Sequence, residues 1–344
     1  MTGWTLQVVE PDGTAVGDPL DCAPGGTVTI SLPEAGGMPH RITALTIHGP
    51  IPDLKGRLLR DRWAGDPGPG ETWLPIRETS RALSDAASAR TMAGVDVTGL
   101  LARARLSRDE IMAPGTDVSD WTGVLLDRYL PAPYRRLFSV ADVDTSIRDE
   151  QVFGPGSTLL EATAGPLSAA AMTPWTPLPN GTAVATGWAP AAQRPVVETF
   201  GDETAPPDAA GFYGDGWDVD PDDVAPLDNE VLAVVRATGD LPQIVGRWAD
   251  EADIYATGRR TVVVPGQVEA TDQRAADLIA ARYAEEHVRR RAEISFDGPF
   301  RPIRPGQIAR VVWAKWGIDG LFELVSKTVQ RNVAADTRYV LREV

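Results

Sequence analysis

Two similar stretches of sequence lie near opposite ends of the chain: GPIPDLKGRLLRDRW at residues 49–63 and GPFRPIRPGQIARVVW at residues 298–313. Each begins with Gly-Pro and an apolar residue, reaches a second glycine, and continues through an apolar residue and an arginine to a closing tryptophan. The second stretch is longer by one residue. The pair indicates a duplicated β-module, one copy near each end of the chain. The alternative is a chance similarity of two Pro/Gly turns that lead into strands.

Short β-rich runs separated by Gly/Pro turns surround the first stretch. They lie at residues 4–9, 27–32, 41–48, 56–63 and 95–105. Runs of this length and spacing predict a small barrel or sandwich. We therefore expect an N-terminal β-barrel over residues 1–112.

The second stretch lies in a C-terminal zone, residues 229–344, that combines strands with one helix. Strands are predicted at 231–237, 260–264, 308–316, 321–329 and 337–344, with a hairpin loop at 317–320. The helix is predicted over residues 271–291, with Thr271 as its N-cap, Asp272 in its first turn and arginines in its last turn. This order predicts a second barrel with a packed helix.

The middle zone, residues 113–228, combines helices with a hairpin. Helices are predicted at 121–129 and 158–172. A hairpin over 175–188 is predicted to turn at Asn180-Gly181, because this dipeptide tolerates the positive φ angles of a type I′ turn. The whole chain is therefore expected to have a β-rich α+β fold, with two similar small β-barrels and an inserted α+β domain that ends in an acidic loop.

Length and composition exclude several classes of protein. With 344 residues, 43% of them hydrophobic, the chain has material for two or three packed domains. One cysteine, Cys22, and three histidines cannot build a disulfide scaffold or a zinc finger. The first residues lack the basic and apolar run of an export signal, so we expect synthesis in the cytoplasm. Five prolines interrupt the longest uncharged stretch, residues 162–193, so we expect no membrane span.

The charge of the chain is acidic and unevenly distributed. There are 33 basic and 48 acidic residues, a net charge of −15. Residues 201–230 carry ten acidic residues and no basic residue. Because an acidic surface repels a phosphate backbone, we expect no specific binding of nucleic acid.

Motifs for catalysis are missing from the sequence. A serine or cysteine nucleophile needs a base, and His40, His48 and His287 stand in no catalytic motif. The glycine-rich run GDPGPG at 65–70 contains prolines, which remove the backbone donors that a phosphate cradle needs. We therefore expect no enzyme activity, no catalytic residue and no cofactor.

The acidic loop contains the best candidate for a metal site. Asp218, Asp220 and Asp222 stand at alternate positions, from which carboxylates can converge on calcium. The loop departs from an EF-hand, because Asp223 stands where glycine is needed and Glu230 comes one place late. The alternatives are a solvated acidic loop, or a carboxylate pair of the glycosidase type, which would need one partly buried partner.

Ten tryptophans raise the question of a sugar-binding site. Five of them fall in or beside predicted strands: Trp4, Trp63, Trp73, Trp313 and Trp316. In strands, packing in a core or at a subunit interface is the more usual role of an indole ring. We expect an interface rather than a sugar site.

One pattern runs through the C-terminal zone: VVVPG at 262–266, a helix at 272–291, GPF at 298–300 with IRPGQIARV at 303–311, and GLFELVSKTV at 320–329. This pattern resembles the end of the baseplate and tail-tip hub proteins of tailed phages and contractile injection machines. Residues 51–63, 95–103 and 122–127 resemble, more loosely, the hub barrel and the start of its inserted domain in phages of actinobacteria. The acidic loop and the hairpin at 175–188 have no counterpart in the resemblance.

The resemblance implies a structural protein of the virion, a minor tail protein at the tail tip or baseplate. Such hubs are homotrimers in which each subunit contributes two similar barrels to a pseudo-sixfold ring. The ring joins the tail tube or a distal tail protein to a threefold tip or fibre protein, has the tape measure protein as a further neighbour, and leaves a channel for DNA ejection. Two alternatives stay open: a tail-associated cell-wall hydrolase and a receptor-binding tail module.

Overall fold

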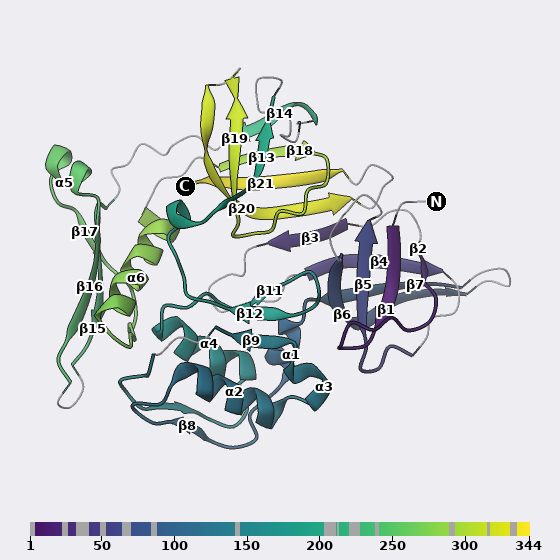
Figure 1. Cartoon of the computed structure of the whole chain (residues 1–344), viewed down its shortest axis with the longest axis horizontal. Coiled ribbons are helices and arrows are strands. Elements are labelled where there is room, and N and C mark those ends of the chain that lie inside the picture. Colours follow the sequence, from purple (N-terminus) through teal and green to yellow (C-terminus); the bar gives the residue numbers. More distant parts are fainter. Residues whose placement is uncertain are drawn as a thin grey trace.

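Most strands of the chain belong to one large sheet. The computed structural model describes residues 4–22, 27–31, 41–48, 53–63, 70–83, 88–141, 145–202, 211, 213–219, 228–237, 241–288, 293–314, 317–330 and 336–344. Within these residues, 13 strands form one sheet, and three smaller sheets hold two or three strands each. The large sheet consists of an N-terminal half and a C-terminal half, which lie side by side in Figure 1 (purple and yellow).

The N-terminal half has the strand order β1-β5-β6-β7-β4-β3, with β2 paired to β4. Its strands are β1 (Trp4–Val9), β2 (Asp21–Cys22), β3 (Thr27–Ser31), β4 (Arg41–His48), β5 (Leu58–Trp63), β6 (Glu71–Leu83) and β7 (Ser88–Val95). Leu6, Val8, Leu59 and Trp73 are fully buried and form the core of this half. Alternation of buried and exposed residues along β1 and β5 directs one face of each strand to this core.

The C-terminal half has the order β13-β19-β20-β21-β18-β14, which repeats the N-terminal order strand for strand. Its strands are β13 (Val196–Gly201), β14 (Tyr213–Val219), β18 (Glu293–Gly298), β19 (Ile308–Trp313), β20 (Ile318–Gln330) and β21 (Thr337–Glu343). Phe200, Phe296 and Tyr339 lie with their ring centroids 4.9–5.5 Å apart in its core. One difference is that β13 runs parallel to β19, whereas β1 runs antiparallel to β5.

The two similar sequence stretches occupy the same place in the two halves. Each forms a turn and then the strand β5 or β19, and the turn glycines Gly56 and Gly306 both have positive φ, +78° and +85°. The long neighbouring strands also agree, since β6 and β20 are interrupted at equivalent points, between Pro75 and Arg77 and between Leu324 and Ser326. This agreement in order and register supports duplication over chance similarity.

A single strand pairing joins the two halves. Strand β3 of the N-terminal half runs antiparallel along β20 of the C-terminal half, with Thr27 opposite Gln330 and Ser31 opposite Ser326. The pairing makes the 13 strands continuous (Figure 1). Trp63 adds a contact to this joint, because its ring packs edge-on against Phe300 at 5.6 Å between centroids.

The fold class is β-rich α+β, as predicted, but the sheet does not close into separate barrels. In the C-terminal half, β13 and β14 are edges that pair with no further described strand. In the N-terminal half, only the single-residue bridges Leu6–Leu20 and Val9–Ala15 turn the chain back onto β1. The expected barrels are thus two curved halves of one open sheet among the described strands.

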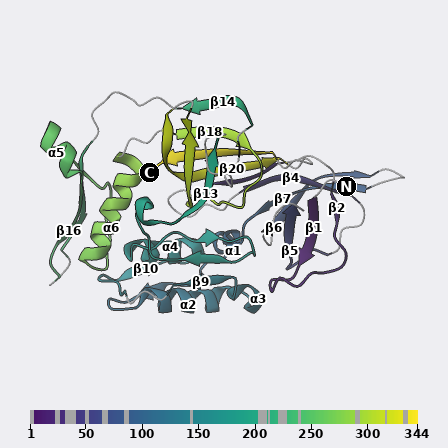
Figure 2. The ribbon, with the colours of Figure 1, turned by 45° about the horizontal axis from the view of Figure 1, so that its top comes forward.

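A compact α+β unit follows the N-terminal half and covers one side of the molecule (Figure 2). Its elements are α1 (Thr98–Arg103), β8 (Glu110–Met112), α2 (Val118–Tyr129), α3 (Ala132–Arg135), β9 (Phe138–Val140), β10 (Gln151–Phe153), α4 (Leu159–Ala169), β11 (Thr176–Pro177) and β12 (Ala183–Ala185). Trp121 and Trp175 lie in its core, and their indole nitrogens donate hydrogen bonds to Ala162 O and Thr163 Oγ1. The predicted helices at 121–129 and 158–172 are confirmed. The hairpin does turn at Asn180-Gly181, but it is not the predicted type I′ turn, because Gly181 has a positive φ of +85° and Asn180 does not.

An arm projects from the side opposite the N-terminal half (green in Figure 1). It consists of β15 (Glu230–Val235), β16 (Ile244–Ala249), α5 (Glu251–Thr257), β17 (Thr261–Val263) and α6 (Gln273–Tyr283), which continues as one turn of π-helix, Ala284–Val288. Alanines of α6 approach the sheet closely, and Gly246 is needed there because a Cβ would lie 2.1 Å from the backbone of Ala276.

Three local predictions are wrong. The predicted strand at 95–105 is helix α1, because the Asp96 carboxylate accepts the Thr98 backbone N–H and ends β7. Asp272, not Thr271, caps α6, since its side chain accepts from Ala275 N at 2.7 Å. Residues 318–320 belong to β20 rather than to a loop, because the turn uses Gly317, whose φ is +67°.

A mutation at the start of α4 tests the capping box found there. Thr158 accepts the Glu161 backbone N–H at 3.0 Å, and the Glu161 carboxylate accepts the Thr158 backbone N–H at 2.7 Å. We expect Thr158→Ala to lower the free energy of unfolding by about 1 kcal/mol. Urea denaturation measures the change, and Ser107→Ala at an exposed position, expected to change it by less than about 0.5 kcal/mol, is the control.

The contacts suggest a finer division than the three predicted domains 1–112, 113–228 and 229–344. We propose four parts, with α1 joined to the helices of the middle unit because Leu101 and Leu106 share its core. Strands β13 and β14 then belong to the C-terminal half, with which they pair. The arm, residues 230–288, forms the fourth part.

Candidate functional site

The predicted calcium ligands lie on or beside an edge strand. Asp218 lies in β14, opposite Ser295 of β18, whereas Asp220 and Asp222 fall outside the described residues. Within the residues that the structure describes, no group of three or more His, Cys, Asp or Glu side chains converges on a point. The calcium site therefore stays a prediction, but the predicted acidic loop is wrong in part, because residues 213–219 form strand β14, which pairs with β18.

The histidines are placed separately. His287 lies in the π-helical turn, and its ring stacks on Tyr283 at 4.4 Å between centroids and 14° between planes. His48 ends β4, and His40 falls outside the described residues. The stack on Tyr283 covers one face of the His287 ring. This packing agrees with the absence of a catalytic motif around His287 in the sequence.

Two buried carboxylates, Glu230 and Glu110, are held in ion pairs. Glu230 is 3% exposed and accepts hydrogen bonds from Thr261 Oγ1 and Arg247 Nε, both at 2.6 Å. The Thr261 hydroxyl first, and then Arg247, keep the pKa of Glu230 below its ordinary value. Burial opposes ionisation of Glu110, but hydrogen bonds from Tyr129, Arg108 and Arg128 outweigh it and lower the pKa. Both groups are anions at neutral pH and cannot serve as general acids there.

Removal of the Glu230 charge should make the free energy of unfolding less dependent on pH in the acidic range. Because the pKa of Glu230 is lower in the folded chain than in the unfolded chain, its stabilisation is complete above about pH 4.5 and is lost as pH falls through the folded value. We expect Glu230→Gln to cost about 1–2 kcal/mol at pH 7 and less at pH 3. Denaturation at both pH values measures the difference, and an equal cost at both would contradict it.

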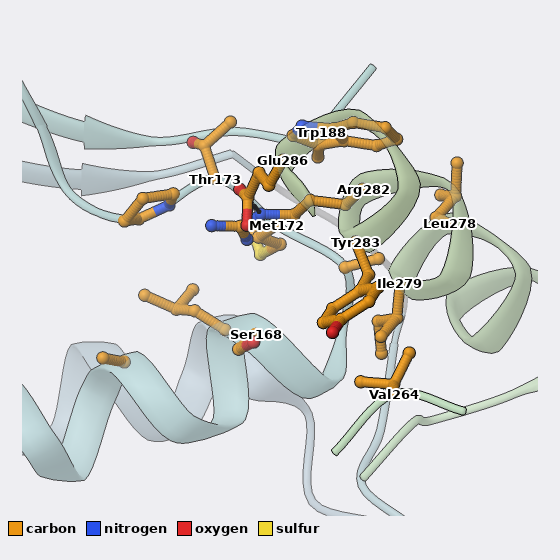
Figure 3. A pocket seen from close by; sticks show the side chains of 14 residues that line it. Ser168, Met172, Thr173, Trp188, Val264, Leu278, Ile279, Arg282, Tyr283 and Glu286 are labelled. Carbon is orange, nitrogen blue, oxygen red and sulfur yellow. Dashed lines mark hydrogen bonds and ion pairs between the residues drawn. The ribbon is translucent and has the colours of Figure 1, made fainter. Parts of the chain in front are cut away.

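An apolar pocket of about 220 Å³ lies between α4 and α6 (Figure 3). Met172 and Ser168 line one side, and Leu278, Ile279 and Tyr283 of α6 line the other. Arg282 lies at its margin and donates to Glu286 at 2.9 Å. The lining offers no imidazole to activate the Ser168 hydroxyl, so its chemistry is that of apolar packing.

A second, more polar cleft of about 390 Å³ adjoins the pocket, at the place where the middle unit, the arm and the C-terminal half meet. Arg194 is its central residue. The guanidinium donates to Ala189 O, Gly306 O and Glu323 Oε1, and lies 3.9 Å from Glu285 Oε2. Glu285 in turn accepts from the Ala191 backbone N–H at 3.1 Å. The contacts of Arg194 and Glu285 in this junction cleft hold the linker before β13 against the arm and the C-terminal half.

The remaining candidate surfaces are strand edges and exposed apolar side chains. Ile111 and Val152 are register partners on β8 and β10 and are 55% and 57% exposed. Tyr255, on α5 of the arm, is 95% exposed. Edge strands and exposed apolar groups of this kind are typical of surfaces that contact other proteins.

Sequence reasoning missed the junction cleft, because Arg194, Glu285 and Glu323 are 38 to 129 residues apart and share no motif. The only signal was that Arg194 is the single basic residue between positions 151 and 200. Trp73 and Trp313 are buried in strands and Trp63 packs at the joint, so these indoles pack within the chain, and the expected subunit interface stays a prediction. Trp316 falls outside the described residues.

None of the helices in the described part of the chain has the length and apolar character of a membrane span. No protein-family model matches the sequence, and no curated protein matches it either.

Solved structures do match the fold over nearly the whole chain. A tail protein from Neisseria meningitidis MC58 is 18% identical, with a TM-score of 0.65 over 99% of this chain and 96% of that one. The 43 kDa tail protein of prophage MuSo2 from Shewanella oneidensis is 12% identical, with a TM-score of 0.61 over 99% and 98%. An E. coli component of the type VI secretion system, described as structurally similar to the T4 tail proteins gp27 and gp5, is 10% identical, with a TM-score of 0.57 over 98% and 76%.

These matches confirm, at the level of the fold, the resemblance to tail and baseplate hub proteins. The chain has the fold of phage tail proteins, including the two similar β halves and the unit inserted between them.

Proposed function

We propose that the protein is a structural hub of a phage tail tip or baseplate, or of a related injection machine. In this proposal it forms a homotrimeric ring in which six β halves adapt the sixfold tail tube to a threefold tip. One observation carries the proposal: two halves with the same strand order and the same strand irregularity lie in one chain that has the fold of tail proteins.

The proposed partners follow from the ring. A tail tube or distal tail protein would dock on one side, a tip or fibre protein on the other, and the tape measure protein would lie along the axis. The net charge of −15 suits a channel through which DNA passes without binding. The protein would be located in the virion tail and would act without catalysis or cofactor.

Native mass spectrometry of the purified chain tests the proposal. A mass of three subunits, about three times 36.8 kDa, and ring-shaped particles with a central opening are the expected results. A stable monomer or dimer at micromolar concentration would contradict the trimer.

Two assays separate this function from its alternatives. A cell-wall hydrolase would clear peptidoglycan in a zymogram and lose that activity when one carboxylate between residues 198 and 230 is replaced. A receptor-binding module would adhere saturably to host cells or glycans as an isolated protein. We expect neither clearing nor adhesion.

A further inference from the structure

The joint between the two halves of this chain offers a template for the joint between subunits. Strand β3 lies at the outer edge of the N-terminal half, beyond β4, and β14 lies at the same position beyond β18. The registers agree, since Val28 stands opposite Ile42 and Val219 stands opposite Ile294. Strand β14 is therefore the counterpart of β3 in the C-terminal half.

The strand that receives β3 also has a counterpart. Strand β20 pairs with β19 over its first part and with β3 over residues 326–330, on the same edge. Its counterpart, β6, pairs with β5 only over residues 71–73. Strand β6 has a second irregularity, between Glu78 and Ser80, which β20 lacks. With Thr79 as the extra residue, residues 77–82 of β6 correspond to residues 326–330 of β20, and no described strand occupies that edge.

Each half therefore has an outer strand, β3 or β14, and a long strand, β20 or β6, with an edge on which such an outer strand can pair. The chain joins one of each internally, through β3 and β20, and leaves β14 and the outer part of β6 unpaired by any described strand. When the surface that reaches out and the surface that receives are different, copies associate head to tail, and they close into a ring if the rotation permits.

We propose that β14 of one subunit pairs antiparallel with residues 77–82 of β6 in the next subunit. This inference rests on the proposed homotrimer and names the interface that closes it. The internal joint gives the register: Val28 opposite Val329 corresponds to Val219 opposite Arg81 of the neighbour. Three such joints between subunits and three within them make the six halves of the ring continuous.

The duplication favours a second copy of this chain as the partner of β6. Within the chain, β3, the counterpart of β14, already pairs with the corresponding edge of β20. A second copy therefore provides a strand that matches this edge of β6.

Disulfide cross-linking tests the proposed register in the full chain. With Cys22 replaced by serine, the variant Val219→Cys/Arg81→Cys is oxidised with copper phenanthroline, because paired strands place Cα atoms at disulfide distance. We expect covalent dimers and trimers on a denaturing gel, with less product when Ser80→Cys or Ala82→Cys replaces Arg81→Cys. Val28→Cys/Val329→Cys should cross-link within one chain, without a gain in mass.

A matched control places the second cysteine on the other edge of the same half. Val219→Cys/Thr5→Cys should give no covalent oligomer, since Thr5 lies on β1. Native mass spectrometry of each unoxidised variant separates the two proposals. A trimer without cross-links at residues 80–82 would overturn the strand pairing and leave the trimer intact. A monomer would overturn both, and covalent oligomers larger than trimers would show an open chain of subunits instead of a ring.

Discussion

Gly94→Leu should lower the free energy of unfolding by about 3 kcal/mol, because the core beside Gly94 is filled by an indole ring. A Cβ on Gly94 would lie 1.9 Å from Cε3 of Trp73 and 2.9 Å from the Leu74 carbonyl oxygen. Trp73 is fully buried, so its ring cannot swing into solvent. Urea denaturation followed by near-ultraviolet circular dichroism measures the loss and reports on the tryptophan environment.

The duplication predicts which second mutation relieves the clash. In the C-terminal half, Phe322 stands where Trp73 stands, and Leu341 stands where Gly94 stands. The two halves thus fill equivalent space with tryptophan and glycine in one case, and with phenylalanine and leucine in the other. We expect Gly94→Leu/Trp73→Phe to be more stable than Gly94→Leu alone, because the smaller phenylalanine ring offsets part of the volume that leucine adds.

Gly123→Ala is the matched glycine control. Gly123 lies on the exposed side of α2, and a Cβ there meets no atom within 4 Å. Replacement should leave stability unchanged or raise it by up to about 1 kcal/mol, since alanine favours helix. A Gly94→Leu variant as stable as the parent, or a double variant less stable than Gly94→Leu, would contradict the equivalence of the two cores.

Arg194→Ala should cost about 3 kcal/mol, because it leaves two nearly buried carboxylates without their guanidinium. The side chains of Glu285 and Glu323 are only 8% and 11% exposed. The same change removes the hydrogen bonds to Ala189 O and Gly306 O, which hold the linker to the C-terminal half. We therefore also expect faster proteolysis near residues 187–195 in the native state.

Arg282→Ala is the control for the arginine variant. Arg282 lines the same junction cleft and has the same exposure, 22%, but its partner Glu286 is 43% exposed. An exposed ion pair at (i, i+4) contributes less than about 1 kcal/mol, so this variant should be nearly neutral. Equal losses for the two variants, measured by denaturation, would show that the cleft gains no stability from the buried ion pairs of Arg194.

Local patterns in the sequence were enough to predict most elements. The alternation of apolar residues in 308–313, the Asn180-Gly181 turn and the helix at 121–129 all depend on neighbours within a few residues, and the structure contains them. The errors also lie at this level. At Asp96 and Asp272 a side chain binds the backbone two or three residues ahead, and this contact moved an element boundary by overriding the apolar pattern.

The sequence by itself determined the β-rich class and indicated the duplication, because a repeat preserves the order of turn glycine, strand and tryptophan even when other residues change. The strand order of the two halves then favoured duplication over chance similarity. Only the tertiary structure decided how the copies are joined. The pairing of β3 with β20 and the burial of Glu285 and Glu323 around Arg194 bring together residues separated by 38 to about 300 positions. Main-chain hydrogen bonds and ion pairs over such separations leave no periodic trace in the chain, since their geometry depends on the path of everything between them.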